Sequence, residues 1–279
     1  VGGVPDAHAY LHTKQVIDSY SVFAQGTVGL GERTDLTIGA RYTEDKINGS
    51  GRTDFEIPGV VFIPGITEAE STKFRKLTWK GALDHKFTDD IMVFASISRG
   101  FKSGIYNLLP YSPTPAEPEV LDAYELGIKT QWFNRRLRLN ASYFHYDIKD
   151  PQVNIYPPGG AAGIQLINAG AAKVDGFDLD GEAVLHGGLS LTFGFTYLNA
   201  RYTDFTNAPF YHPSPYPHAG TPPSIPDPVS GNANGNRMPQ APRYAGNVGL
   251  SYEHDLGDIG RLNLSGNYYR SGAYYFNPH

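Results

Sequence analysis

The feature that most constrains this sequence is a period-two alternation of apolar with small or polar residues, which returns five times along the chain. Each return follows a sharp turn rich in Gly, Asn or Asp, which supply the backbone conformations that tight hairpins require. Because successive side chains of a strand point to opposite faces, each segment is predicted to be a β-strand with one apolar face. The apolar positions are Leu36, Ile38, Ala40 and Tyr42; Ile91, Val93, Ala95 and Ile97; Leu137, Leu139, Ala141 and Tyr143; Leu189, Leu191, Phe193, Phe195 and Tyr197; and Leu262, Leu264, Gly266 and Tyr268.

The connections between these segments alternate in length. Many of the segments run for ten residues or more, whereas strands of soluble proteins average about 5–6 residues. Several end in Tyr, Phe or Trp, as the aromatic belt of a membrane interface does. Short turns at one end and long loops at the other are typical of bacterial outer-membrane barrels. The sharp turns lie at 29–33, 88–90, 133–135, 186–188 and 257–260, and long loops are expected at roughly 47–70, 106–118, 150–165 and 206–241.

These patterns predict an all-β fold, the wall of an antiparallel transmembrane β-barrel with about ten strands. Composition agrees, with 19 Tyr and 15 Phe against 2 Met, while a mean hydropathy of -0.35 reflects the weak signal of transmembrane strands. No uninterrupted apolar run reaches the ~18 residues of a transmembrane helix. The absence of Cys excludes disulfides and thiolate metal sites, and the net charge of -5 argues against a nucleic-acid partner.

Two further segments carry expectations of their own. Residues 206–241 are rich in Pro, Gly, Asn and Tyr, so we expect a mobile surface loop that builds no core. The first residues, Val1–Pro5, have neither a basic start nor an apolar stretch, so a signal peptide would have been removed or would lie upstream.

Five motifs, in this order and at hairpin spacing, resemble the barrel of TonB-dependent outer-membrane receptors. The likeness extends over most of the chain from about Ser19 onward, and the ordered set is specific although each motif alone is weak. The motifs are Ser98–Gly104; Pro118–Val120 with Tyr124–Thr130; Arg136–Ala141 with Phe144, Tyr146 and Gln152; Asn168–Ala171 with Gly176–Asp178; and Pro242–Tyr244.

The resemblance implies a 22-stranded barrel whose lumen holds an N-terminal plug domain. It also implies active uptake of a scarce ligand (siderophore-bound iron, a vitamin or an oligosaccharide), powered through the plug by the TonB energising complex. Residues 1–279 are then expected to be a partial outer-membrane barrel domain, with the plug and the closing strands outside this chain. The expected surroundings are outer-membrane lipid.

The candidate site residues form two groups, one in the lumen and one in the long loops. Strand alternation puts a first set on the lumen side, where cation binding by the three carboxylates is the alternative to plain lumen polarity. Aromatic faces with polar tips in the loops suit sugars or planar chelates, against the alternative that they pack on one another. The lumen set is Arg41, Lys129, Arg138, Asp178, Asp180 and Glu182, and the loop set is Tyr106, Tyr111, Tyr156, Phe210, Tyr211, His212 and Tyr216.

No catalytic arrangement, cofactor motif or metal motif is recognised in the sequence. His8 and His12 stand four apart but lack a carboxylate in the pattern, so we interpret them as unligated. Arg99 falls on the apolar face of its strand, which predicts either a strand end at the lipid headgroups or a bulge that turns the side chain inward.

Two other functions compete with the receptor. A passive outer-membrane porin would obey the same alternation but would have no plug. A soluble all-β carbohydrate-binding protein is disfavoured by the long strands and the asymmetric loops.

Overall fold

The computed structural model of this chain describes residues 8–155, 164–211 and 228–276. Its elements are almost all strands. The first seven are β1 (His8–Gly29), β2 (Thr34–Ile57), β3 (Val61–Ile63), β4 (Glu68–Thr88), β5 (Ile91–Lys102), β6 (Glu119–Trp132) and β7 (Leu137–Lys149). The others are β8 (Gln152–Ile155), β9 (Gln165–Asn168), β10 (Ala171–Val184), β11 (Leu189–Asp204), β12 (Ala208–Tyr211), β13 (Pro228–Gly231), β14 (Tyr244–Asp255), the 3₁₀ turn η1 (Gly257–Ile259) and β15 (Arg261–Ser271).

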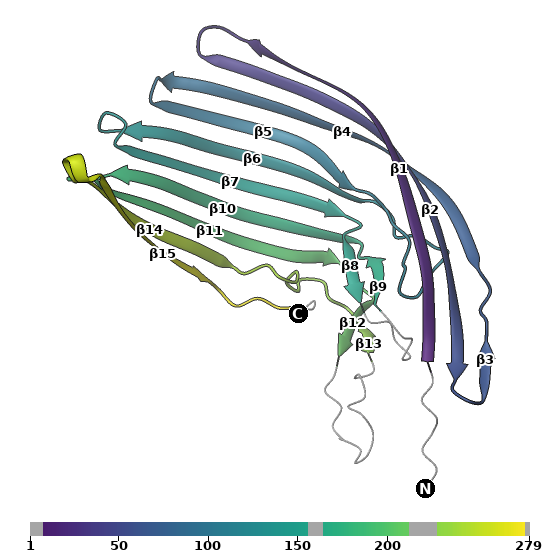
Figure 1. Cartoon of the computed structure of the whole chain (residues 1–279). Coiled ribbons are helices and arrows are strands. Elements are labelled where there is room, and N and C mark those ends of the chain that lie inside the picture. The colour runs from purple at the N-terminus through teal and green to yellow at the C-terminus, as the bar shows by residue number, and fades with distance from the viewer. Residues whose placement is uncertain (1–7, 156–163, 212–227, 277–279) are drawn as a thin grey trace.

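Ten strands form one antiparallel sheet in the order β1-β2-β4-β5-β6-β7-β10-β11-β14-β15, and β3 pairs with β2. The sheet curves strongly, with β1 and β15 at its two edges (Figure 1). Within the described part of the chain each of these edge strands has one neighbour, so the sheet is not closed. The predicted fold class, about ten antiparallel strands of a barrel wall, is confirmed.

All five predicted sharp turns lie at one end of the sheet, which we call the short-turn end. Four of them contain residues with positive φ: Phe133, Asn134 and Arg135 have φ of 56°, 57° and 66°, and Gly187 and Gly188 have φ of 71° and 82°. The other two are the first turn, through Gly31, and the last, through Gly257 and Gly260. Positive φ matches the right-handed twist of the flanking strands. The opposite end, called the long-loop end, carries the two small hairpins β8–β9 and β12–β13 (Figure 1).

Two loop predictions are wrong. The segment 47–70 is mostly strand, because β2 runs on to Ile57 and β4 begins at Glu68. The described parts of 206–241 are also structured: Ala208 and Ala233 are fully buried and β12 pairs with β13. A Pro-rich and Gly-rich composition is a weak guide where neighbouring strands supply the apolar surface.

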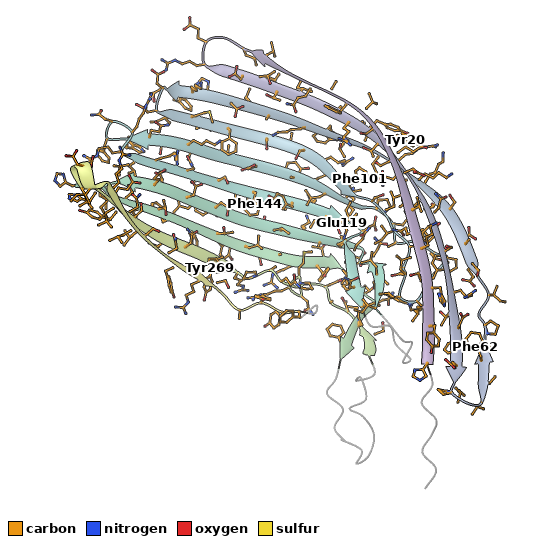
Figure 2. All side chains as sticks on the ribbon, viewed as in Figure 1. Tyr20, Phe62, Phe101, Glu119, Phe144 and Tyr269 are labelled. Atoms are coloured by element: carbon orange, nitrogen blue, oxygen red, sulfur yellow. The ribbon has the colours of Figure 1, made fainter. Side chains whose placement is uncertain are left out.

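The two faces of the sheet differ in polarity. The face we call outer exposes apolar and aromatic side chains, among them Tyr20 at 72%, Ile38 at 60% and Leu126 at 57% exposed (Tyr20 in Figure 2). Exposed apolar surface on this scale is typical of a face covered by another phase or partner. The opposite face, called inner, carries the polar positions and the packed loops. Among the described residues no helix has the length and apolarity to cross a membrane.

Arg99 keeps the outer-face position that alternation gives it. The β5–β6 pairing runs without a shift from Ile91 to Lys102, so no bulge turns the side chain inward. Its guanidinium donates to both carboxylate oxygens of Asp122, at 2.6 and 2.7 Å, and lies 6.0 Å from the Trp79 ring centroid. The bulge is therefore excluded, and the interpretation of a strand end at the headgroups stays a prediction.

Candidate functional site

The inner face near the short-turn end is lined by paired polar side chains from β7, β10 and β11. The Arg138 guanidinium forms an ion pair with Glu182, and the Asn140 amide donates to Asp180 at 2.9 Å. The Thr196 hydroxyl donates to Asp178 at 2.6 Å. These carboxylates are neighbours along β10 and each has a partner on an adjacent strand. The arrangement is that of a hydrogen-bonded polar wall.

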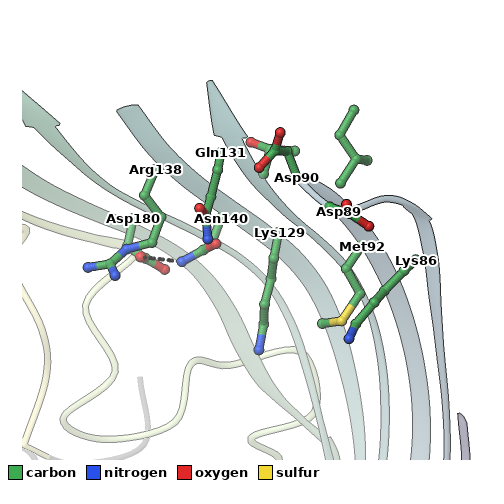
Figure 3. Close-up of a pocket in the computed structure, with 11 residues that line it drawn as sticks. Lys86, Asp89, Asp90, Met92, Lys129, Gln131, Arg138, Asn140 and Asp180 are labelled. Atoms are coloured by element: carbon green, nitrogen blue, oxygen red, sulfur yellow. Dashed lines mark hydrogen bonds between the residues drawn. The ribbon is translucent and has the colours of Figure 1, made fainter. Parts of the chain in front are cut away.

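Two hollows lie along this wall, with volumes of about 430 and 520 Å³, and both are lined by Lys129, Asn140 and Asp180. The Lys129 amine extends into this region and lies 5.2 Å from the Phe94 ring centroid (Figure 3). Arg41 lies farther along the inner face, where its Nε donates to the Thr43 hydroxyl at 3.2 Å. The six residues of the predicted lumen set therefore share one face. Within the described residues no group of His, Asp or Glu has a metal-binding arrangement.

The long-loop end is organised by residues 103–118, the connection from β5 to β6, which we call the strap. Tyr106 is 3% exposed and packs with Ile47 and Phe74 on the inner face of β2 and β4. Its backbone N–H donates to the side-chain oxygen of Gln15 at 3.0 Å, and the Tyr111 hydroxyl donates to the carbonyl of Gly49 at 3.1 Å. Burial raises the pKa of the Tyr106 phenol.

Glycines in β2 make room for these two tyrosine rings. A Cβ on Gly49 would lie 2.6 Å from the Tyr106 ring, and one on Gly51 would overlap Tyr111. The glycines are thus required by close approach, since a strand position gains little else from the absence of a side chain. One edge of the strap is fixed to β1, β2 and β4.

The other edge of the strap is fixed to the β8–β9 hairpin by three amide side chains, which we call the clasp. Asn107 donates to the Leu166 carbonyl at 3.0 Å and accepts from the Leu166 N–H. Asn168 donates to the Glu117 carbonyl at 3.0 Å and accepts from the Glu117 N–H at 2.8 Å. Gln152 donates to the carbonyls of Ser103 and Glu117 at 2.9 and 3.0 Å. A carboxamide that bonds both groups of one residue reproduces the pairing of two strands.

An apolar cluster beneath the hairpins anchors them to the sheet. We call it the loop cluster; Val153 and Ile155 come from β8, Ala208 from β12, Ala233 from the segment after β13, and Tyr202 from the end of β11. All five are buried, Tyr202 to 1% exposure. Phe144 (labelled in Figure 2) and Ile148 are the buried members of the cluster from β7. Burying the larger apolar side chains, such as Val153 and Ile155, stabilises by roughly 1.5–3 kcal/mol each, so the hairpins are docked elements.

The predicted loop residues divide into three groups. Tyr106 and Tyr111 lie together in the strap, with the Tyr106 ring committed to packing. Phe210 and Tyr211 belong to β12, and Phe210 packs against the loop cluster. The remaining three, Tyr156, His212 and Tyr216, lie outside the described residues.

The sequence does not predict that the three amide side chains of the clasp act together, although Gln152 and Asn168 belong to the motifs of the family resemblance. Asn and Gln at loop positions read as turn formers, and nothing in their spacing indicates a partner far away in the chain. The one signal for a shared role is their position, because Gln152 begins β8, Asn168 ends β9 and Asn107 lies within the strap.

A polar cluster joins β1 to β2 where both strands extend past the strap. Asp54 is 4% exposed and pairs with His12 Nε2 at 3.2 Å and Arg52 Nε at 3.0 Å, and it accepts from the Gly65 N–H at 2.8 Å. This hydrogen bond from Gly65, followed by the nearby cations, holds the pKa of the Asp54 carboxyl below its usual value. His12 thus has a carboxylate partner from the neighbouring strand.

Residues 2–279 match the family described as "TonB dependent receptor-like, beta-barrel". The pesticin receptor of Yersinia enterocolitica is 24% identical over 231 residues, which cover 81% of this chain and 29% of that protein. The probable TonB-dependent siderophore receptor PiuA of Acinetobacter baumannii is 28% identical over 137 residues, 49% of this chain and 16% of the relative.

Solved structures share the fold at lower identity. The crystal structure of the ferric yersiniabactin uptake receptor FyuA from Yersinia pestis superposes with a TM-score of 0.73 and 20% identity, over 97% of this chain and 36% of that one. This chain therefore spans about a third of the length of the pesticin receptor and of FyuA, 29% and 36% respectively. The family consists of outer-membrane transport receptors. The chain belongs to the TonB-dependent receptors and forms part of their outer-membrane β-barrel.

Proposed function

We propose that the protein containing this chain takes up a ferric siderophore across the bacterial outer membrane, with energy supplied through TonB. The observation that carries the proposal is the match of residues 2–279 to the barrel of this receptor family. The curated relative PiuA, named as a probable siderophore receptor, directs the choice among siderophores, vitamins and oligosaccharides toward siderophores. The chain itself forms one side of the passage and alters no ligand chemically.

The long-loop end faces the outside in this proposal, since barrels of this class have long extracellular loops and short periplasmic turns. The strap, the clasp and the hairpin β8–β9 then form one docked structure at the mouth of the passage. The ligand would meet the free side of this structure. The predicted contacts are Tyr111, together with Tyr156, Tyr211, His212 and Tyr216, and Tyr106 supports them from below.

The polar inner wall has a separate role in this proposal. Its paired groups, including Arg138 with Glu182 and Asn140 with Asp180, offer fixed charges and amides to a plug domain supplied by the rest of the protein. Lys129 extends from the wall between two hollows and would contact that plug. The plug and the energising complex are proposed for the whole protein, since the folded wall by itself requires neither of them.

The proposal is tested by uptake of radioactive iron in cells that express the full-length gene as their only receptor of this kind. Supplied with a panel of ferric siderophores under iron limitation, cells should accumulate iron from at least one member only when TonB is present. Uptake that persists without TonB would support the passive porin instead. TonB-dependent accumulation of a vitamin or an oligosaccharide, with none of the siderophores, would keep the receptor and overturn the ligand class.

A further inference from the structure

The outer face of β1, β2 and β4 carries a group of charged side chains beyond its aromatic and apolar residues. The cross-strand pair Tyr42–Leu77 belongs to the apolar surface, with the two side chains 43% and 58% exposed. The next outer-face pair toward the long-loop end is Glu44–Arg75, and the one after that is Lys46–Lys73. Each step of two residues moves about 7 Å along the strand. Charge therefore begins directly where the apolar surface stops.

This group, which we call the basic patch, has more cations than carboxylates. Glu44 is shared by Lys73, at 3.0 Å, and Arg75, at 2.7 Å. Lys46 stands directly opposite Lys73 on one side and Asp18 on the other. Three cations thus face two carboxylates in a chain whose formal net charge is -5. Like charges directly opposite each other destabilise a sheet, so a further anion beside Lys46 and Lys73 would be stabilising.

A hollow of about 450 Å³ opens on the same face, one strand pair beyond the lysines. By register its outer-face lining comprises Asn48, which lies between Val16 and Ser71, and Ser50, which lies between Lys14 and Ala69. The Ser and Ala side chains are small and leave the hollow open, and Asn48, Ser50 and Ser71 supply amide and hydroxyl groups beside the apolar Val16 and the Lys14 cation. Such groups pair with sugar hydroxyls, which offer both donors and acceptors.

We propose that the basic patch and this hollow together bind the headgroup of a phosphorylated glycolipid of the outer leaflet. Phosphate lies against Lys46, Lys73 and Arg75, sugar hydroxyls enter the hollow beside Asn48 and Ser71, and the acyl chains cover the apolar surface below. The order of the three zones along the strands matches the order of acyl, phosphate and sugar in such a lipid. The inference uses only the outer-membrane location and is independent of the transported ligand.

The test compares two variants of the full-length receptor in nanodiscs, each lacking two lysines. Lys46→Gln with Lys73→Gln removes outer-face charge, whereas Lys76→Gln with Lys80→Gln removes the same charge from the inner face, where these residues oppose Thr43 and Gly39. Native mass spectrometry measures the dissociation constant of the phosphorylated glycolipid. Each cation near an anionic lipid surface is worth about fivefold in binding, so the outer variant should bind roughly 25-fold more weakly and the control as well as the parent protein.

A third variant is expected to tighten binding, a result that a folding defect cannot produce. Glu44→Gln removes the anion that competes for Lys73 and Arg75, so it should tighten glycolipid binding by about fivefold. Equal binding of the dephosphorylated lipid would overturn the proposal, as would equal weakening in the inner-face control. If inorganic phosphate displaces the lipid at a concentration equal to that of the lipid, the patch binds free phosphate, and the proposal of a lipid is overturned.

Discussion

Replacing Tyr106 by alanine tests whether packing on the barrel wall holds the strap in place. The ring is 3% exposed and lies among Ile47, Phe74 and Gly49. Truncating a buried aromatic to alanine costs about 3–5 kcal/mol in a packed core. We expect the lower end of this range, because the Tyr111 ring, 5.9 Å from the Tyr106 ring between centroids, can move into the cavity that the substitution leaves.

A loss of about 3 kcal/mol in docking free energy raises the population of the undocked strap by roughly a hundredfold. Hydrogen exchange of the full-length receptor in detergent detects this at the N–H groups of Ser112 and Ala116, which bond to carbonyls within the strap at 3.0 and 2.8 Å. Their exchange should accelerate by that factor. Amides of the sheet should be unchanged, since the ladder bonds do not involve the strap.

Leu109→Ala is the matched control, because Leu109 lies in the same strap but is 57% exposed. It should leave the exchange of both amides within about twofold of the parent protein, as surface substitutions usually do. Equal acceleration in the two variants would show that the strap is held by its own turns. No acceleration in Tyr106→Ala would refute the packing argument outright.

Three further perturbations have expected outcomes. Asn168→Ala removes hydrogen bonds to three main-chain groups and should speed exchange in both the strap and β9 by about tenfold, measured in the same experiment. The lowered pKa of the Asp54 carboxyl means that its contribution to stability is complete above the unfolded value of about 3.9 and is lost as the pH falls through the folded value. The Gly65 amide resonance should report this loss and should be insensitive to acid in Asp54→Asn. Arg99→Ala leaves the Asp122 carboxylate without its bidentate partner and should lower the thermal midpoint in detergent by more than the Arg99→Ala/Asp122→Ala double variant does.

The sheet was predictable from the sequence because one rule generates most of it. Period-two alternation gives the strands, the face of every residue on them and, with the Gly and Asn turns, the antiparallel order. The error at 47–70 has a specific cause. Gly49 and Gly51 read as loop residues, whereas in the structure they are strand positions kept bare for the rings of Tyr106 and Tyr111. A glycine that makes room for a distant side chain has no local signature.

The loop structure was unpredictable for a related reason. The hairpin β12–β13 lies in a segment whose composition favours disorder, but Ala208 and Ala233 gain an apolar partner from Tyr202 at the end of β11. Such a core is supplied from outside the segment, so composition alone underestimates its order. The face of the six residues in the lumen set, in contrast, follows from local alternation and needs no distant partner.

The strap also changes how the wall can respond to a ligand. A barrel wall is connected through neighbouring strands, so a local disturbance at β2 reaches β7 only across β4, β5 and β6. The strap contacts β2 through Tyr106 and the β8–β9 hairpin through Asn107, and thus joins these distant parts directly. Movement of the hairpin away from the wall must break the clasp or lift Tyr106 from its packing. Because each step removes several contacts at once, we expect discrete docked and undocked states at the long-loop end, and a ligand that contacts either loop would bias both.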